Sequence, residues 1–367
     1  MSPRTSLQCA LAVVAAVSLA LVAGCKPSHA VRIGFLGDVI SELGIGGRNG
    51  AQLAVETLNA EHEGGYELLV EDDRNDPEAA RAAVASFASR GAAFVVGPMT
   101  STMAVAVVPE ANRLGVVLIS PTATTDELSG KDDFFFRTAA DAPAGARQLA
   151  RLLRDRGVRS IAVLMDIANG AYSSSFGHAA AVEFQNLGGK TASEVNYRSG
   201  NSLDFADAMR RVASKPPDAV ILVNSPSDAA IAAQHLRRVA PAIVIAVSPW
   251  GANVQFAQVG GRASEGAIAL QAVDLASPQP LMRGFVTRYR SRFGELPTTS
   301  AVQGYEAVML GVDALNRRAG RSLRATLSVP GQWAGLDGNF SLDAYGDTRR
   351  VLHLTEVHDG RFEALPR

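Results

Sequence analysis

Short apolar runs alternate with longer amphipathic stretches along most of this chain. Apolar runs of four to six residues are typical of buried strands, and the longer stretches have the spacing of helices. Strands are predicted at 31–36, 67–70, 93–96 and 116–119, and helices at 47–61, 77–89 and 102–112. Strands that alternate with helices form parallel sheets with right-handed crossovers. The pattern therefore predicts an α/β fold.

The same alternation begins a second time after residue 140. Strands are predicted at 160–164, 194–197, 219–223 and 243–247, with helices at 144–155, 174–187, 205–214 and 227–239. Helices at 281–293 and 301–318 follow, and then strands at 338–342 and 349–357. A chain of 367 residues is too long for one ordinary core, so we expect two lobes of similar architecture.

Composition excludes several classes of protein. The 35 basic and 36 acidic residues leave a net charge of -1, which provides no excess of cations for binding nucleic acid. A hydrophobic content of 47% argues against a disordered chain. Two cysteines cannot form a disulfide framework or a thiolate metal site.

The first 24 residues are predicted to be a signal peptide. Arg4 supplies a positive charge, and residues 7–22 are almost entirely apolar. The end of this segment, Val-Ala-Gly-Cys, resembles a bacterial lipobox, which implies that Cys25 is lipidated and becomes the mature N-terminus. The alternative is an ordinary cleavage near Ala30. Lys26 stands where an inner-membrane retention signal would have aspartate, so we expect the outer membrane in a cell that has one.

The glycines near the first strand do not form a dinucleotide fingerprint. Gly44 and Gly46 would need a third glycine at position 49, which is Asn49, and the first glycine lies well beyond the strand. We expect these glycines to let a ligand or a loop approach the backbone. The sequence also lacks the common nucleophile, zinc-protease and Walker motifs, and its six histidines are scattered. We therefore expect no enzyme activity, metal or cofactor.

Hydroxyl side chains follow two of the predicted strands. Ser101 and Thr102 lie at a helix start after the third strand, and residues 120–125 follow the fourth strand. Ligands of open α/β sheets bind beyond the carboxyl ends of strands, and a helix N-terminus with hydroxyls can hold a carboxylate. A plain helix cap would explain one such hydroxyl. Two neighbouring loops with this composition favour a ligand.

Several motifs in order resemble the leucine/isoleucine/valine-binding protein family, the type I solute-binding proteins of ABC transporters. The resemblance covers nearly all of residues 31–357 and rests on six segments: 50–51, 71–77, 96–102, 119–124, 166–173 and 259–266. It implies two Rossmann-like lobes joined by three crossovers, near 138–141, 272–274 and 335–339, with the ligand between the lobes. Lobe one would comprise 31–138 plus 274–336, and lobe two 139–273 plus 337–367.

The resemblance also implies roles for individual residues. Ser101 and nearby N–H groups would hold a ligand carboxylate, while Thr122 and Thr124 would hold the ammonium and carboxylate. Tyr172 would close over the ligand from lobe two. Leu43 would touch the ligand side chain, and the loop 224–227, which includes Ser225, would lie nearby.

One position departs from the family pattern. Amino-acid binders place an acid after the last strand of lobe two, where it meets the ligand ammonium, but this chain has Trp250 there. An aromatic wall of the site and a simple packing residue are both open for Trp250. An amide or aromatic carboxylate is slightly favoured over an amino compound held by the indole.

The sequence as a whole predicts an extracytoplasmic, lipid-anchored binding protein. It would capture a small amino-acid-like or carboxylate solute, without chemistry, for a membrane permease of the ABC type, and it would be a monomer. The alternative is a sensory module of the same fold that acts on an envelope receptor or enzyme.

Overall fold

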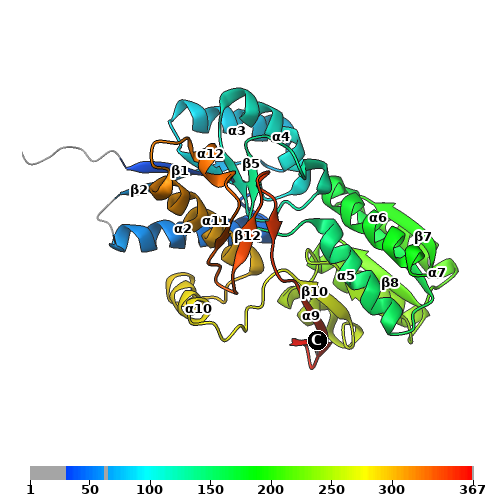
Figure 1. Cartoon of the computed structure of the whole chain (residues 1–367). Helices are drawn as coiled ribbons and strands as arrows, with labels where there is room; N and C mark the ends of the chain where they lie inside the picture. The colour runs from blue at the N-terminus through cyan, green and yellow to red at the C-terminus, as the bar shows by residue number, and fades with distance from the viewer. Residues whose placement is uncertain (1–29, 62–64, 366–367) are drawn as a thin grey trace, which may run out of the picture.

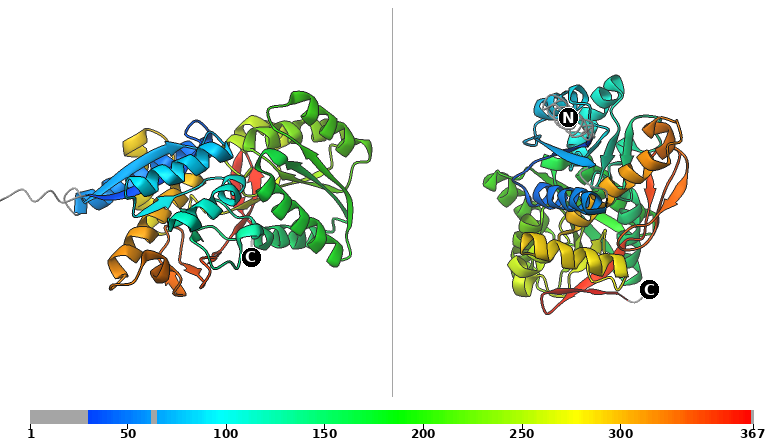
Figure 2. Two further views of the ribbon diagram at one scale, coloured as in Figure 1. Left: turned by 90° about the horizontal axis from the view of Figure 1, so that it is seen from above. Right: turned by 90° about the vertical axis from the view of Figure 1, so that its left-hand side faces the viewer.

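Two parallel sheets, each covered by helices, lie side by side in the computed structural model, which describes residues 30–61 and 65–365 (Figure 1). The first sheet has the strand order β2-β1-β3-β4-β5, and the second has the order β15-β14-β10-β9-β8-β6-β7. Each sheet with its helices forms one lobe (Figure 2). This arrangement confirms the predicted α/β fold with two parallel-sheet lobes.

All five strands of the first sheet are parallel, and its central strands are buried on both faces. The strands are β1 (Val31–Gly37), β2 (Tyr66–Asp72), β3 (Phe94–Val96), β4 (Leu118–Ser120) and β5 (Phe135–Arg137). One face packs against α3 (Pro77–Ser89) and α4 (Ser101–Leu114). The other face packs against α2 (Glu42–Glu61), α10 (Pro280–Phe293), α11 (Thr299–Arg317) and α12 (Leu323–Leu327). Helices far apart in sequence therefore share one core.

The second sheet is parallel except at one edge, where β14 runs antiparallel to β10 and continues into β15. Its strands are β6 (Ser160–Asp166), β7 (Lys190–Tyr197), β8 (Ala219–Val223), β9 (Val244–Val247), β10 (Ile268–Gln271), β14 (His353–His358) and β15 (Arg361–Ala364). Its helices are α5 (Ala142–Asp155), α6 (Gly170–Asn186), α7 (Ser202–Ser214), α8 (Pro226–Val239) and α9 (Val254–Gly260). Two core clusters, one on each face, hold this lobe together.

Helix α2 begins at Glu42, five residues before the start predicted from the sequence. Its early turns contain four glycines, and glycine lowers helix propensity by about 1 kcal/mol each. Tertiary packing outweighs that cost, because α11 crosses α2 at the glycines. A Cβ on Gly50 would lie 1.9 Å from the carbonyl oxygen of Ala301. The close approach expected at these glycines is therefore made at Gly50 by a helix of the same lobe.

A small antiparallel sheet connects the end of the first lobe to the second. It is formed by β11 (Gly331–Trp333), β12 (Phe340–Leu342) and β13 (Thr348–Arg349). Phe340 and Leu342 pack into the core of the first lobe, so the chain joins the second sheet only at His353. The predicted boundary at 337 lies between β11 and β12 of this small sheet.

Hydrogen bonds and one buried ion pair join the crossover segments to one another. Asp337 accepts a hydrogen bond from the backbone N–H of Asp274 at 2.8 Å and lies 2.8 Å from Nε2 of His353. Burial favours a raised pKa at Asp337, but the bonds from His353 and Asp274 hold that pKa below its usual value. The almost fully buried pair Arg350–Glu306 has an N–O distance of 2.7 Å, and Arg350 also donates to the carbonyl of Thr138. The three crossovers are thus coupled.

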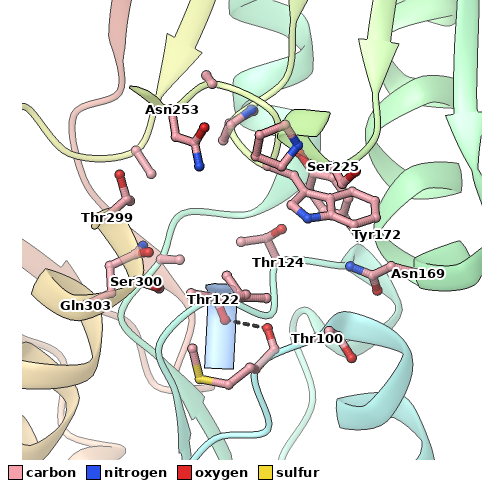
Figure 3. A pocket seen from close by; sticks show the side chains of 18 of the residues that line it. Thr100, Thr122, Thr124, Asn169, Tyr172, Ser225, Asn253, Thr299, Ser300 and Gln303 are labelled. Carbon is pink, nitrogen blue, oxygen red and sulfur yellow. Dashed lines mark hydrogen bonds between the residues drawn. The ribbon is translucent and has the colours of Figure 1, made fainter. Parts of the chain in front are cut away.

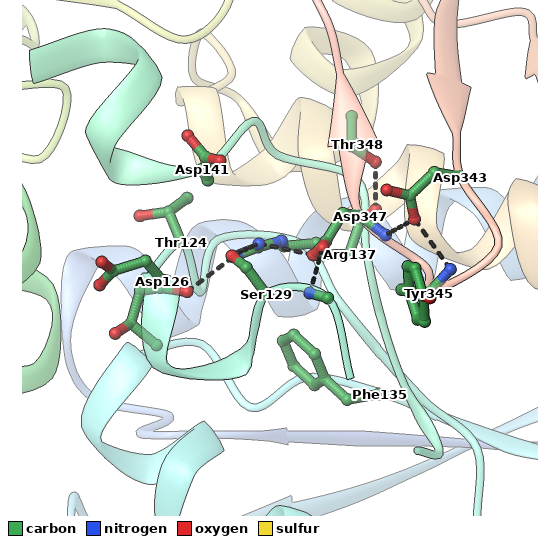
Figure 4. Close-up of polar contacts among 12 residues, drawn as sticks. Thr124, Asp126, Ser129, Phe135, Arg137, Asp141, Asp343, Tyr345, Asp347 and Thr348 are labelled. Carbon is green, nitrogen blue, oxygen red and sulfur yellow. Dashed lines mark hydrogen bonds and ion pairs between the residues drawn. The ribbon is translucent and has the colours of Figure 1, made fainter. Parts of the chain in front are cut away.

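Arg137, the last residue of β5, is fully buried at the start of the first crossover (Figure 4). Its guanidinium donates to Asp347 at 2.6 Å, to the hydroxyl of Ser129 at 2.5 Å and to the carbonyl of Thr125 at 2.9 Å. Thr348 donates its hydroxyl to the carbonyl of Arg137. The loop after β4 is therefore fixed to the β12–β13 turn.

None of the helices in residues 30–61 and 65–365 combines the length and the apolar character that a membrane-spanning helix needs.

Candidate functional site

A cavity of about 450 Å³ lies between the two lobes (Figure 3). Side chains of both lobes and of the first crossover line it. From the first lobe come Asp38, Ser41, Glu42, Leu43, Asn75, Met99, Thr100, Thr122, Thr124, Thr298, Thr299, Ser300 and Gln303. The second lobe contributes Asn169, Tyr172, Phe176, Ser225, Pro226, Ser227, Pro249, Trp250, Ala252, Asn253 and Gln255, among others. The volume is that of a site for a small molecule.

Six of the eight residues predicted to bind a ligand line this cavity: Leu43, Thr122, Thr124, Tyr172, Ser225 and Trp250. Parallel strands bring them together, because the loops that follow β4, β8 and β9 leave their sheets at the edges that face the other lobe. In the first lobe, the hydroxyl of Thr122 donates to the carbonyl of Met99, which joins the loops after β3 and β4 (Figure 3).

Ser101 lies just behind the cavity wall. Its side chain is 1% exposed, and its hydroxyl oxygen accepts the backbone N–H groups of Thr124 at 3.0 Å and Thr125 at 3.2 Å. The hydroxyl therefore supports the loop that carries Thr124. Ser101 is also the first residue of α4 rather than its cap, because the hydroxyl of Thr100 accepts the N–H of Met103.

Thr102 likewise does not line the cavity and instead contacts the other lobe. Its backbone N–H donates to Oδ1 of Asn169 at 3.2 Å, and its hydroxyl accepts the N–H of Ala171 at 3.3 Å. The start of α4 thus meets the start of α6, and the two lobes are joined on this side of the cavity.

The second-lobe wall is aromatic. Tyr172 and Trp250 are in edge-to-face contact, with ring centroids 5.9 Å apart and an interplanar angle of 86°. Tyr172 is 6% exposed, and burial raises the pKa of its hydroxyl. Trp250 is half-buried and lines the cavity. Ser225 accepts the N–H of Asp228 and caps α8.

Sequence reasoning missed the part of the wall that comes from the start of α11. Thr299, Ser300 and Gln303 point toward the cavity opposite the second lobe (Figure 3). The run Thr298-Thr299-Ser300 at a helix start is the same signal that drew attention to residues 100–102. It could have been found, but its proximity to the site depends on the packing of α11 against α2.

The charged residues that line the cavity are all acidic. They are Asp38, Glu42 and Asp141, and no lysine, arginine or histidine belongs to the described lining. Burial raises the pKa of Glu42, while the hydrogen bond from Asn253 acts in the opposite direction. Asp141 caps α5 by accepting the N–H of Ala144 at 2.8 Å.

Both sides of the cavity have bonds between the lobes. Nδ2 of Asn253 donates to Oε1 of Glu42 at 2.7 Å on one side. On the other side, the N–H of Asp126 donates to the hydroxyl of Ser175 at 3.2 Å, next to the contact of Thr102 with Asn169. The lobes are therefore in a closed arrangement.

In residues 30–61 and 65–365, no group of three or more histidine, cysteine, aspartate or glutamate side chains could hold a metal ion. The predicted signal segment 1–24 and Cys25 lie outside the described residues.

Comparisons with known proteins agree with this arrangement. A family model described as a periplasmic binding protein matches residues 30–361. The Leu/Ile/Val-binding protein BraC3 of Rhizobium johnstonii is 26% identical over 283 residues, which cover 72% of this chain and 73% of that protein. The leucine-binding protein LivK of Thermotoga maritima has a TM-score of 0.79 at 23% identity, covering 92% of this chain and 98% of that chain. An ABC transporter solute-binding protein of R. palustris, solved with benzoate, has a TM-score of 0.80 at 20% identity, covering 92% and 95%.

Proposed function

Because this chain belongs to the periplasmic binding protein family, whose members are extracytoplasmic substrate-binding proteins, we propose that it captures a small solute for an ABC transporter. The solute would be amino-acid-like or a carboxylate, and the protein would bind it without catalysing a reaction. The observation that carries this proposal is the cavity between the lobes, which both lobes line with polar and aromatic side chains.

Closure of the lobes is the proposed mechanism of capture. A ligand that contacts both walls stabilises the closed state, because only that state makes both sets of contacts. The moving bodies would be the two lobes, with the crossover segments as the hinge. The bonds Glu42–Asn253 and Thr102–Asn169 would then break and form as the lobes move.

The six predicted residues that line the cavity are proposed to contact the ligand. Thr122, Thr124 and Leu43 would do so from the first lobe, and Tyr172, Ser225 and Trp250 from the second. Ser101 and Thr102 would act indirectly, the first through the loop of Thr124 and the second through Asn169.

A lipid anchor at Cys25 is proposed to hold the protein at the membrane, with the outer membrane favoured by Lys26. Two acyl chains give stable attachment where one chain is marginal. Cys25→Ser should release the protein into the soluble fraction or leave it unprocessed. Mass spectrometry that finds an unmodified N-terminus at residue 26 or later in the native protein would contradict the anchor.

A thermal-shift screen over amino acids, amides, amines and aromatic carboxylates tests the proposed binding function. A ligand present at 100 times its Kd should stabilise the fold by about 2.7 kcal/mol. Small-angle scattering should then show a closed particle with that ligand, and Trp250→Ala should weaken its binding. A screen in which no compound shifts the melting temperature would argue against the function.

A further inference from the structure

The charge of the cavity wall restricts what it can hold. Its three charged residues are carboxylic acids, and its remaining polar side chains are hydroxyls, amides and the indole of Trp250. Behind the first-lobe wall, the guanidiniums of Arg137 and Arg350 are buried and already paired, with Asp347 and Glu306 respectively. An anion in this cavity would face carboxylates without a cation to offset them, and such juxtaposition of like charge is unfavourable.

In the loops after β3 and β4, four N–H groups that could hold a carboxylate are already bonded within the protein. Those of Thr124 and Thr125 donate to Ser101. At the start of α4, the N–H of Thr102 donates to Asn169 and that of Met103 to Thr100. A ligand carboxylate would have to displace these acceptors. The helix terminus that the sequence suggested as an anion site is therefore occupied by the amide oxygen of Asn169.

Acceptors, by contrast, remain available. Glu42 is exposed to solvent at the cavity edge and receives one bond, from Asn253 to Oε1; its Oε2 has no hydrogen-bond partner among the described residues. A carboxylate in this position can accept N–H groups of a cation, and charge-assisted bonds of this kind are among the stronger hydrogen bonds. The half-buried indole of Trp250, oriented by its edge-to-face contact with Tyr172, adds an aromatic surface that attracts cations.

We propose that the ligand is an organic cation without a carboxylate, such as an amine or an amino-acid amide, and that Glu42 accepts its N–H groups. This inference rests on the proposed binding function. It places the acid on the first lobe, at the start of α2, whereas the family pattern places one after the last strand of the second lobe, where this chain has Trp250. The acid absent from one wall is thus supplied by the opposite wall.

Isothermal titration calorimetry with two matched sets of probes tests the proposal. The aromatic set is benzylamine, benzyl alcohol and benzoate, and the aliphatic set is leucinamide, leucine and N-acetylleucine. We expect the cation of at least one set to bind at least about tenfold more tightly than the anion of that set, because a charged bond of 1.5–3 kcal/mol corresponds to a tenfold to hundredfold ratio.

Glu42→Gln should abolish that preference, since the amide oxygen can still accept the bond from Asn253 while the negative charge is gone. Glu61→Gln, the same change at the far end of the same helix, should leave the preference unaltered. Tighter binding of the anions would overturn the inference and leave the binding function standing. Absence of binding by every probe at about 10 mM would overturn it as well, and the wider thermal-shift screen would then decide the function separately.

Discussion

Nδ2 of Asn253 lies 2.7 Å from Oε1 of Glu42 and links the two lobes across the opening of the cavity. The two residues come from helix starts in different sheets, since Glu42 begins α2 and Asn253 caps α9. This single hydrogen bond therefore reports whether the lobes are closed, and it can be changed without removing either helix start.

Asn253→Asp should open the protein. Aspartate retains the oxygen that caps α9, but it places a second carboxylate against Glu42, at a cost of about 1 kcal/mol because Glu42 is partly solvated. Small-angle scattering of the ligand-free protein should show a larger radius of gyration than that of the wild type. The double substitution Asn253→Asp and Glu42→Gln restores a donor and an acceptor, and should restore the original profile. Identical profiles for all three proteins would exclude this role.

Arg137→Met should destabilise the protein by about 3–5 kcal/mol, because it removes one partner of a buried ion pair and takes the guanidinium donor from Oδ1 of Asp347 and from the carbonyl of Thr125. Urea denaturation measures this change. The control is Arg113→Met, which breaks the exposed pair with Glu110 on α4 and should not shift the midpoint measurably. Equal effects of the two substitutions would show that the buried network contributes no more to the free energy of unfolding than an exposed ion pair does.

Gly50→Ala and Gly284→Ala should have opposite effects, although both introduce alanine within a helix. At Gly50 the new Cβ would overlap the carbonyl of Ala301, which costs about 1–3 kcal/mol or more if α11 has to move. At Gly284 the nearest neighbour is the mobile end of Arg288 at 3.7 Å, so higher helix propensity should stabilise by up to about 1 kcal/mol. Thermal unfolding of both variants is the measurement; a stabilised Gly50→Ala would mean that α2 and α11 are less closely packed than described.

Asp73→Asn should stabilise the protein at neutral pH and not at pH 4. Burial, with the nearby charges of Asp38 and Asp72, raises the pKa of Asp73 from 3.8 to about 6. The folded state therefore binds this proton more tightly than the unfolded chain does, and the associated stability is present below about pH 4 and lost as the pH rises through 6. The full difference is roughly 1–3 kcal/mol. Denaturation midpoints of variant and wild type between pH 4 and 7.5 should diverge in that window, and a constant difference would contradict the assignment.

Local sequence patterns were sufficient to predict most of the sheet strands. The runs at 160–164 and 219–223 became the central strands β6 and β8 because continuous apolar sequence is what a strand buried on both faces requires. The start of α2 was missed for a non-local reason. Its glycines look like helix breakers until α11, which follows far along the chain, packs against them.

The residues of the candidate site also fall into two groups, those that local sequence patterns predict and those whose place depends on tertiary packing. Thr122, Thr124 and Trp250 could be predicted, because the loop that follows a parallel strand has a known place in such folds. Ser300 and Gln303 could not be placed, since their helix reaches the site only through its packing. Nor could the cavity's charge be read from composition, because a net charge of -1 gives no indication that the acids Asp38, Glu42 and Asp141 face the same space.

The packing of α11 against α2 also affects the order in which the two lobes gain their hydrophobic cores during synthesis of the chain. Leu53 and Leu58 of α2 share their core with Val302 and Val308 of α11, which are made only after the whole parallel part of the second lobe. In a chain synthesised from its N-terminus, α2 alone therefore covers that face of the first sheet until α10 and α11 have been made. The second lobe has most of its strands by then. The first lobe therefore gains much of its core only after most of the second lobe has been synthesised, although it comes first in the sequence. The second lobe is completed later still, when β14 and β15 add Val357 and Phe362 to its core.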